Sequence, residues 1–158
     1  MTVFELGAIG EFIGAIAVVV TLVYLTVQLR QNTNALRSNS WQAIQDAEQR
    51  LDMLLASDAK LMEIWVRGST TGLASLDDPV ERSQFHSVGK QLIDLYQTHH
   101  YQYETGMIDV DLWSTWVTQY DESMTNTPGF RDVVKARYRH LRPSFRQFVD
   151  AHPYVVDS

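Results

Sequence analysis

The chain contains no cysteine, which excludes disulfide bonds, cysteine-ligated zinc or iron–sulfur sites, and thiol nucleophiles. It has only 4 prolines and 8 glycines among its 158 residues, a length that fits one domain of modest size. Lysine and arginine are absent before Arg30, although the chain has 13 of them in total. The net charge of −6 disfavours a protein that mainly binds nucleic acid.

Residues 1–30 contain a predicted transmembrane helix. Residues 12–29 carry no charged side chain and are mostly valine, leucine, isoleucine and phenylalanine. At 1.5 Å per residue they span about 27 Å, close to the ~30 Å hydrocarbon core of a bilayer. The alternatives are a buried core helix of a soluble domain and, less favoured, a cleaved signal peptide. A signal peptide would have basic residues before the apolar run, whereas here Glu5 precedes it.

The charges that flank this segment predict its orientation. Arg30 and Arg37 follow the apolar run, and excess basic residues mark the cytoplasmic side of a membrane. We therefore expect a single-pass protein of the cell inner membrane with its N-terminus outside. Residues 31–158 would then form a cytoplasmic α-helical domain.

One face of the apolar segment is small and polar. Alternating spacings of three and four residues connect Gly7, Gly10, Gly14, Ala17, Thr21, Tyr24 and Gln28. This period of 3.5 residues places them along one stripe of a helix, here called the small-residue stripe. Small residues let helices approach closely in lipid, and Thr21 and Gln28 can form hydrogen bonds across such a contact. The pattern predicts a homo-oligomer with left-handed, near-parallel packing through Gly7, Gly10, Gly14, Ala17, Thr21 and Gln28.

Glu11 stands beside the small-residue stripe, near the outer end of the apolar segment. A carboxylate inside a membrane is costly and is often functional. We expect Glu11 to lie at the interface and reach water. The alternative is a ring of Glu11 side chains at the mouth of an oligomeric pore.

Beyond Arg30 the apolar residues recur at helical spacing, and strand alternation is nowhere sustained. The sequence therefore predicts an all-α protein: an N-terminal transmembrane helix followed by a small cytoplasmic helical bundle. No proline or glycine interrupts residues 33–56, so the membrane helix can continue through them. Further helices are expected from Ser57 or Asp58 to near Gly68, from Asp78-Pro79 to Gly106, from Asp109 or Asp111 through Tyr120, from Thr127-Pro128 through Tyr138, and from Pro143 through Val149, with a loop over 69–76. Of Trp113 and Trp116, at least one should pack inside the bundle.

Several motifs are similar to those of a family of uncharacterised bacterial membrane proteins. The matching stretches are residues 7–22, 30–33, 103–109 and 144–150, together with Trp113, Trp116 and the Pro128-Gly129 pair. The resemblance covers both ends and most of the chain. It implies one membrane pass and a helical cytoplasmic part, and it implies no activity.

Residues with catalytic or metal-binding potential are sparse. His100 and Glu104 are four residues apart and are expected to form a solvated pair rather than part of a metal site. His99 follows Leu95 on an apolar face and is expected to be a hydrogen-bonded core histidine. Nucleophile elbows, phosphate loops and dinucleotide fingerprints are absent. We therefore expect no enzyme activity, no cofactor and no metal.

A short basic segment stands out near the C-terminus, with Asp132 as its one opposing charge. Its members are Arg131, Lys135, Arg137, Arg139, Arg142 and Arg146. They would form a solvated face paired with acidic neighbours, contact anionic lipid headgroups, or contact the acidic surface of a partner.

Taken together, these features predict a membrane-anchored, homo-oligomeric helical scaffold or interaction subunit. Its expected partners are the lipid bilayer, further copies of the chain and another membrane protein, with nucleic acid excluded. The main alternative is an oligomeric ion channel whose pore is lined by the small-residue stripe, and a membrane-bound enzyme comes third. A pore requires a wet stripe, whereas a scaffold requires the stripe to be buried between helices.

Overall fold

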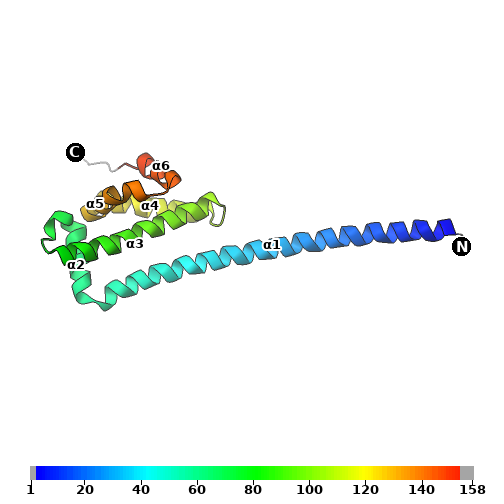
Figure 1. Ribbon diagram of the computed structural model, residues 1–158, viewed down its shortest axis with the longest axis horizontal. Helices are drawn as coiled ribbons and strands as arrows, with labels where there is room; N and C mark the ends of the chain where they lie inside the picture. Colours follow the sequence, from blue (N-terminus) through cyan, green and yellow to red (C-terminus); the bar gives the residue numbers. More distant parts are fainter. Residues whose placement is uncertain (1–2, 154–158) are drawn as a thin grey trace. The chain divides into compact units, whose positions relative to one another are not determined.

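The computed structural model describes residues 3–153, except for the side chains of residues 3–6, 8 and 9. It confirms the predicted all-α class, since this part of the chain contains helices and turns but no strand (Figure 1). The α-helices are α1 (Val3–Ser57), α2 (Ala59–Thr71), α3 (Pro79–Glu104), α4 (Val110–Asn126), α5 (Pro128–Arg137) and α6 (Pro143–Ala151). Two short 3₁₀ helices, η1 (Leu73–Ser75) and η2 (Tyr138–His140), connect them.

The chain divides into two units, Met1–Asn39 and Ser40–Ser158. Helix α1 continues without a break past Arg30 to Ser57, so its last part belongs to the second unit. The sequence places the division after residue 30, whereas residues 31–39 are helical, exposed and part of the first unit. The helical bundle described below consists of residues 40–153.

Aspartate and proline start the bundle helices, as the sequence predicts. The Asp58 carboxylate accepts hydrogen bonds from the first backbone amides of α2, and Asp78 and Asp109 do the same for α3 and α4. These bonds satisfy amides that have no partner within the helix. Proline occupies the first turn of α3, α5 and α6, where its missing N–H is not needed.

The end of α2 differs from the sequence prediction. The helix does not end near Gly68 but continues to Thr71, and the expected loop over 69–76 contains η1. The actual stop is Gly72, whose φ of 85° favours glycine and whose amide bonds to the Gly68 carbonyl oxygen at 2.9 Å. Gly68 has a packing role, because it is buried inside the helix.

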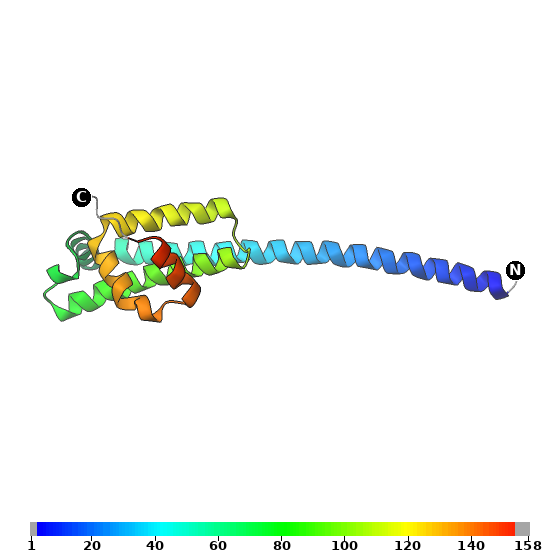
Figure 2. The same ribbon diagram turned by 90° about the horizontal axis from the view of Figure 1, so that it is seen from above.

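Helix α3 lies at the centre of the bundle and contacts α2, α4, α5 and α6 (Figures 1 and 2). The main core is rich in aromatic side chains, with Phe85, Tyr96, Tyr120, Phe130 and Phe145 at most 2% exposed. Several of these rings meet edge to face, an arrangement that adds to the free energy of burial.

The prediction for the two tryptophans is confirmed. Trp113 belongs to the main core, together with Tyr120, and is 8% exposed. Trp116 is partly buried and packs against the same core. Their helix, α4, therefore presents its aromatic face to the bundle.

A glycine contact fixes the close approach of α2, α3 and α5. A Cβ atom on Gly129 would lie 2.1 Å from the Gly68 carbonyl oxygen and 2.6 Å from Phe85 Cζ. A Cβ atom on Gly68 would lie 2.5 Å from Phe85 Cδ2. Since real Cβ atoms do not approach so closely, both positions require the absence of a side chain.

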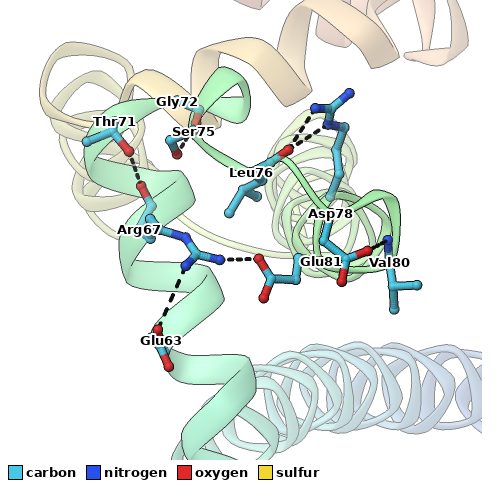
Figure 3. A network of polar contacts seen from close by, with 10 residues as sticks. Glu63, Arg67, Thr71, Gly72, Ser75, Leu76, Asp78, Val80 and Glu81 are labelled. Carbon is cyan, nitrogen blue, oxygen red and sulfur yellow. Dashed lines mark hydrogen bonds and ion pairs between the residues drawn. The ribbon is translucent and has the colours of Figure 1, made fainter.

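A polar network joins α2 to the start of α3 (Figure 3). The Arg67 guanidinium contacts Glu81 on α3 and lies 3.8 Å from Glu63 on its own helix. Arg82 donates two hydrogen bonds, at 3.1 and 2.7 Å, to the carbonyl oxygen of Leu76 before α3. These contacts hold the segment between α2 and α3 against the bundle.

Candidate functional site

The apolar segment of α1 is long and hydrophobic enough to cross a membrane. Its best 18-residue window has a mean hydropathy of 2.3, and none of that window is buried within the chain. Every residue from 10 to 39 is exposed, including Phe12 at 68% and Leu29 at 67%. A core helix of a soluble protein meets the same length and composition criteria, but its side chains would be mostly buried.

The small-residue stripe lies open along this segment. A Cβ atom added to Gly7, Gly10 or Gly14 would meet nothing within 4 Å. Ala17, Thr21, Tyr24 and Gln28 are also exposed. Within the described residues, therefore, no contact explains why these positions are small, and a larger side chain at any of the three glycines would have open space around its Cβ atom.

The polar members of the stripe differ in their hydrogen bonds. The Thr21 hydroxyl donates to the Ala17 carbonyl oxygen of its own helix at 2.8 Å, which satisfies the hydroxyl without a partner helix. Gln28 makes no side-chain hydrogen bond within the described part of the chain. Glu11, beside the stripe, is exposed. Gln28 thus remains the better donor for a second helix.

The basic segment is divided between internal and exposed roles. Arg131 donates hydrogen bonds at 2.7 and 2.8 Å to the carbonyl oxygens of Met124 and Thr125, at the end of α4. Arg137 lies 3.6 Å from Asp94 on α3. Both side chains join helices, but only Arg137 pairs with an acidic neighbour, whereas the described hydrogen bonds of Arg131 are to backbone carbonyls.

The other four basic residues are more open. Lys135, Arg139 and Arg142 are exposed, and Arg146 is half-buried. The Arg142 guanidinium lies 4.2 Å from the centre of the Tyr101 ring, a cation–π contact. Arg142 and Arg146 stand four residues apart at the start of α6 and therefore share a face. Any contact with lipid or a partner would involve this subset rather than all six residues.

His99 is the core histidine that the sequence predicts. Its side chain is fully buried, and Nδ1 donates to the Leu95 carbonyl oxygen at 2.6 Å. Nε2 lies 3.2 Å from Glu48 Oε1, on the last part of α1. The ring stacks on Trp116 of α4, with centroids 3.8 Å apart. His99 therefore links three helices of the bundle.

The expectation for His100 is wrong in one respect. His100 does pair with Glu104, at 3.5 Å, but its side chain is only 12% exposed. The rings of Trp113, Phe145 and Phe148 surround it at centroid distances of 5.3 to 5.5 Å. Burial lowers the pKa of His100, against the opposing effect of Glu104. The i,i+4 spacing of His100 and Glu104 describes α3 alone, whereas the residues that bury His100 belong to α4 and α6.

The structure also contains an open groove that sequence reasoning missed. Two adjoining hollows, of about 680 and 470 Å³, lie between the end of α1 and one face of α3 and share Leu54 and Gln91. We call this feature the α1–α3 groove. The groove is bordered by exposed apolar residues such as Met53 and Leu54. Such residues would not have predicted it, because single exposed apolar residues are common on protein surfaces.

No metal centre is present among the described residues, where no three histidine or acidic side chains come together. Comparison of the chain with protein-family models, curated proteins and solved structures yields no match. The functional conclusions below therefore rest on the residues and geometry of this chain.

Proposed function

We propose that the chain is a single-pass membrane protein whose apolar segment anchors a helical interaction subunit. The observation that carries this proposal is that no residue of an uncharged, apolar helical window is buried. Burial of a valine, leucine or isoleucine side chain contributes about 1.5–3 kcal/mol. The bundle provides no burial for this window, so a bilayer is its natural environment.

The rest of α1 supports an anchor over a signal peptide. The helix continues past Arg30 to Ser57, and its last turns contribute Leu51 and Leu55 to a buried cluster with Val88 of α3. Cleavage after the apolar run would cut a continuous helix. Arg30 and Arg37 after the run support a bundle on the cytoplasmic side of the inner membrane.

We further propose that copies of the chain assemble through the small-residue stripe. Gly7, Gly10 and Gly14 have open space around them, so a second helix could approach their backbone closely. The product would be a homo-oligomeric scaffold that holds several bundles at the membrane. No enzymatic role is proposed.

An ion channel is the second candidate, because Gln28 and Glu11 are polar, exposed and on or beside the stripe. In a channel these side chains would face water along the axis of the oligomer. In a scaffold, these side chains would be buried between helices or lie at the membrane–water interface.

Replacement of Gly14 by leucine tests the assembly. The added side chain has free space in the single chain and would clash only with a partner helix. We expect Gly14→Leu to lower the protomer number in native mass spectrometry, whereas Val20→Leu, off the stripe, leaves it unchanged. An unchanged oligomer in Gly14→Leu would refute assembly through the stripe.

Ion flux in liposomes that is altered by Gln28→Ala would favour the channel, and an intact oligomer without flux would favour the scaffold.

A further inference from the structure

The α1–α3 groove is a long surface feature with no occupant from within the described chain. Its lining residues on α3 run from Pro79 to Thr98, which is about 30 Å of helix at 1.5 Å per residue. The other wall comes from the end of α1, from Ala47 to Ser57, and from Leu61 of α2. A length of about five helical turns exceeds what a small ligand needs.

The floor of the groove is apolar and its walls are partly exposed. Leu51, Leu61 and Val88 form the floor and are at most 9% exposed. On the walls, Met53 is 62% exposed and Leu54 is 43% exposed. Burial of these two side chains by a partner would contribute favourable free energy that the chain alone does not realise.

The α1–α3 pair is covered differently elsewhere along its length. There, Trp116 of α4 stacks on His99 of α3, whose Nε2 lies 3.2 Å from Glu48 Oε1 of α1. At the groove, Leu61 of α2 contributes to the lining, and no other described helix besides α1 and α3 does so. A further helix has room to pack a ridge of side chains along the groove between α1 and α3.

Charge selects the kind of helix. Asp94 is the groove's one acidic residue, and Lys90 and Arg137 already lie 3.3 and 3.6 Å from it. Arg50, on the α1 wall, forms no ion pair within the described residues and is exposed. Arg50 is therefore the one basic residue that lines the groove, and it lies beside an apolar floor.

We propose that the α1–α3 groove binds an amphipathic helix of a partner protein, with a stripe of aliphatic side chains and an acidic side chain that pairs with Arg50. Helices of this type bind apolar grooves through residues at i, i+3, i+4 and i+7. The inference rests on the proposed interaction role, and it requires neither the anchor nor assembly through the small-residue stripe.

The full chain in lipid nanodiscs can be screened against a display library of helical peptides of about 20 residues. Each peptide carries a fixed leucine stripe and randomised flanking positions, and empty nanodiscs remove peptides that bind lipid. We expect enrichment of peptides with aspartate or glutamate at one fixed flanking position. Leu54→Gln should weaken their binding at least tenfold. Val110→Gln, a matched change of an exposed apolar residue outside the groove, should leave it unchanged.

A charge reversal tests the pairing with Arg50. In Arg50→Glu, selection should favour lysine or arginine at the position where the wild-type chain selects an acid, whereas Lys60→Glu on α2 should not alter the preference. Unchanged tryptophan fluorescence and melting would show that each variant is folded.

The proposal would be overturned by an absence of enrichment over empty nanodiscs, by binding that Leu54→Gln leaves intact, or by the same charge preference in Arg50→Glu. A lower protomer number in Leu54→Gln would assign the groove to a second copy of the chain instead. Retention of the oligomer and the membrane anchor in any of these cases would leave those parts of the proposed function standing.

Discussion

The contact between Gly68 and Gly129 shows how single atoms decide the packing of α2 and α5. Each glycine occupies a place where a methyl group would overlap with backbone or with the Phe85 ring. Phe85 is fully buried between the helices, so it has no open space into which it can move. Close packing in protein interiors makes such overlaps costly.

Gly129→Ala should therefore destabilise the bundle by about 1–3 kcal/mol or more. The added Cβ would lie 2.1 Å from a backbone oxygen, which forces α2 and α5 apart. All four tryptophans lie in residues 40–153, so the midpoint of thermal unfolding by tryptophan fluorescence reports on the bundle. Gly7→Ala, where nothing lies within 4 Å of the new Cβ, is the control and should leave the midpoint unchanged.

His100 gives the bundle a defined response to pH. Desolvation lowers its pKa in the folded state, while Glu104 raises it and Arg142 lowers it by smaller amounts. The unfolded chain, with an ordinary histidine pKa of 6.5, therefore binds the proton more readily than the folded chain. The contribution of His100 to stability is complete above pH 6.5 and is lost as the pH falls through 6.5 towards the lowered value.

The free energy of unfolding should thus decrease between pH 7.5 and pH 5, by at most about 1.4 kcal/mol per pH unit for this one proton. Denaturant titrations at several pH values measure the slope. In His100→Gln the slope over this range should be smaller, whatever the absolute stability of the variant. An equal slope in the two proteins would show that His100 does not titrate differently in the folded state.

At the level of helices, the sequence predicts the beginnings better than the ends. The starts at Asp58, Asp78 and Asp109 follow from local chemistry, because the capping residue bonds to amides two or three positions ahead. The end of α2 does not follow from local chemistry, because Gly68 does not end the helix but makes room for Phe85 of α3. Local patterns cannot distinguish a glycine that ends a helix from one that admits a neighbour.

The same limit applies to the candidate sites. The small-residue stripe and the core position of His99 follow from spacing along one helix. The burial of His100 and the α1–α3 groove depend on how helices distant in sequence pack together. Tertiary packing likewise gives Arg131 and Arg137 internal partners, although the sequence shows only a run of positive charge.

The basic segment should accordingly separate into two classes by mutation. Arg131→Ala removes hydrogen bonds from a charged donor to the end of α4 and should cost about 1.5–3 kcal/mol. Arg139→Ala removes an exposed side chain and should change stability by less than about 0.5 kcal/mol. Chemical denaturation measures both. Equal losses would contradict this division of the segment.

The two units of the whole molecule satisfy different physical requirements. Residues 40–153 bury an aromatic core, and aspartate caps bond to first-turn amides of α2, α3 and α4. Residues 10–39 bury none of their side chains, although residues 12–29 are mostly apolar. A bilayer would suit the apolar part of the first unit, Met1–Asn39, since backbone hydrogen bonds within a helix leave few polar groups exposed to lipid.

Membrane fractionation combined with protease protection tests the anchor most directly. After alkaline carbonate washing, the full chain should remain with the membranes. Protease added to inside-out vesicles should digest the bundle, whereas protease added to right-side-out spheroplasts should leave it intact. This is the result expected if the bundle lies in the cytoplasm, the orientation that we propose from Arg30 and Arg37. Recovery of the chain in the soluble fraction without detergent would contradict the membrane anchor, and digestion of the bundle from outside would contradict its orientation.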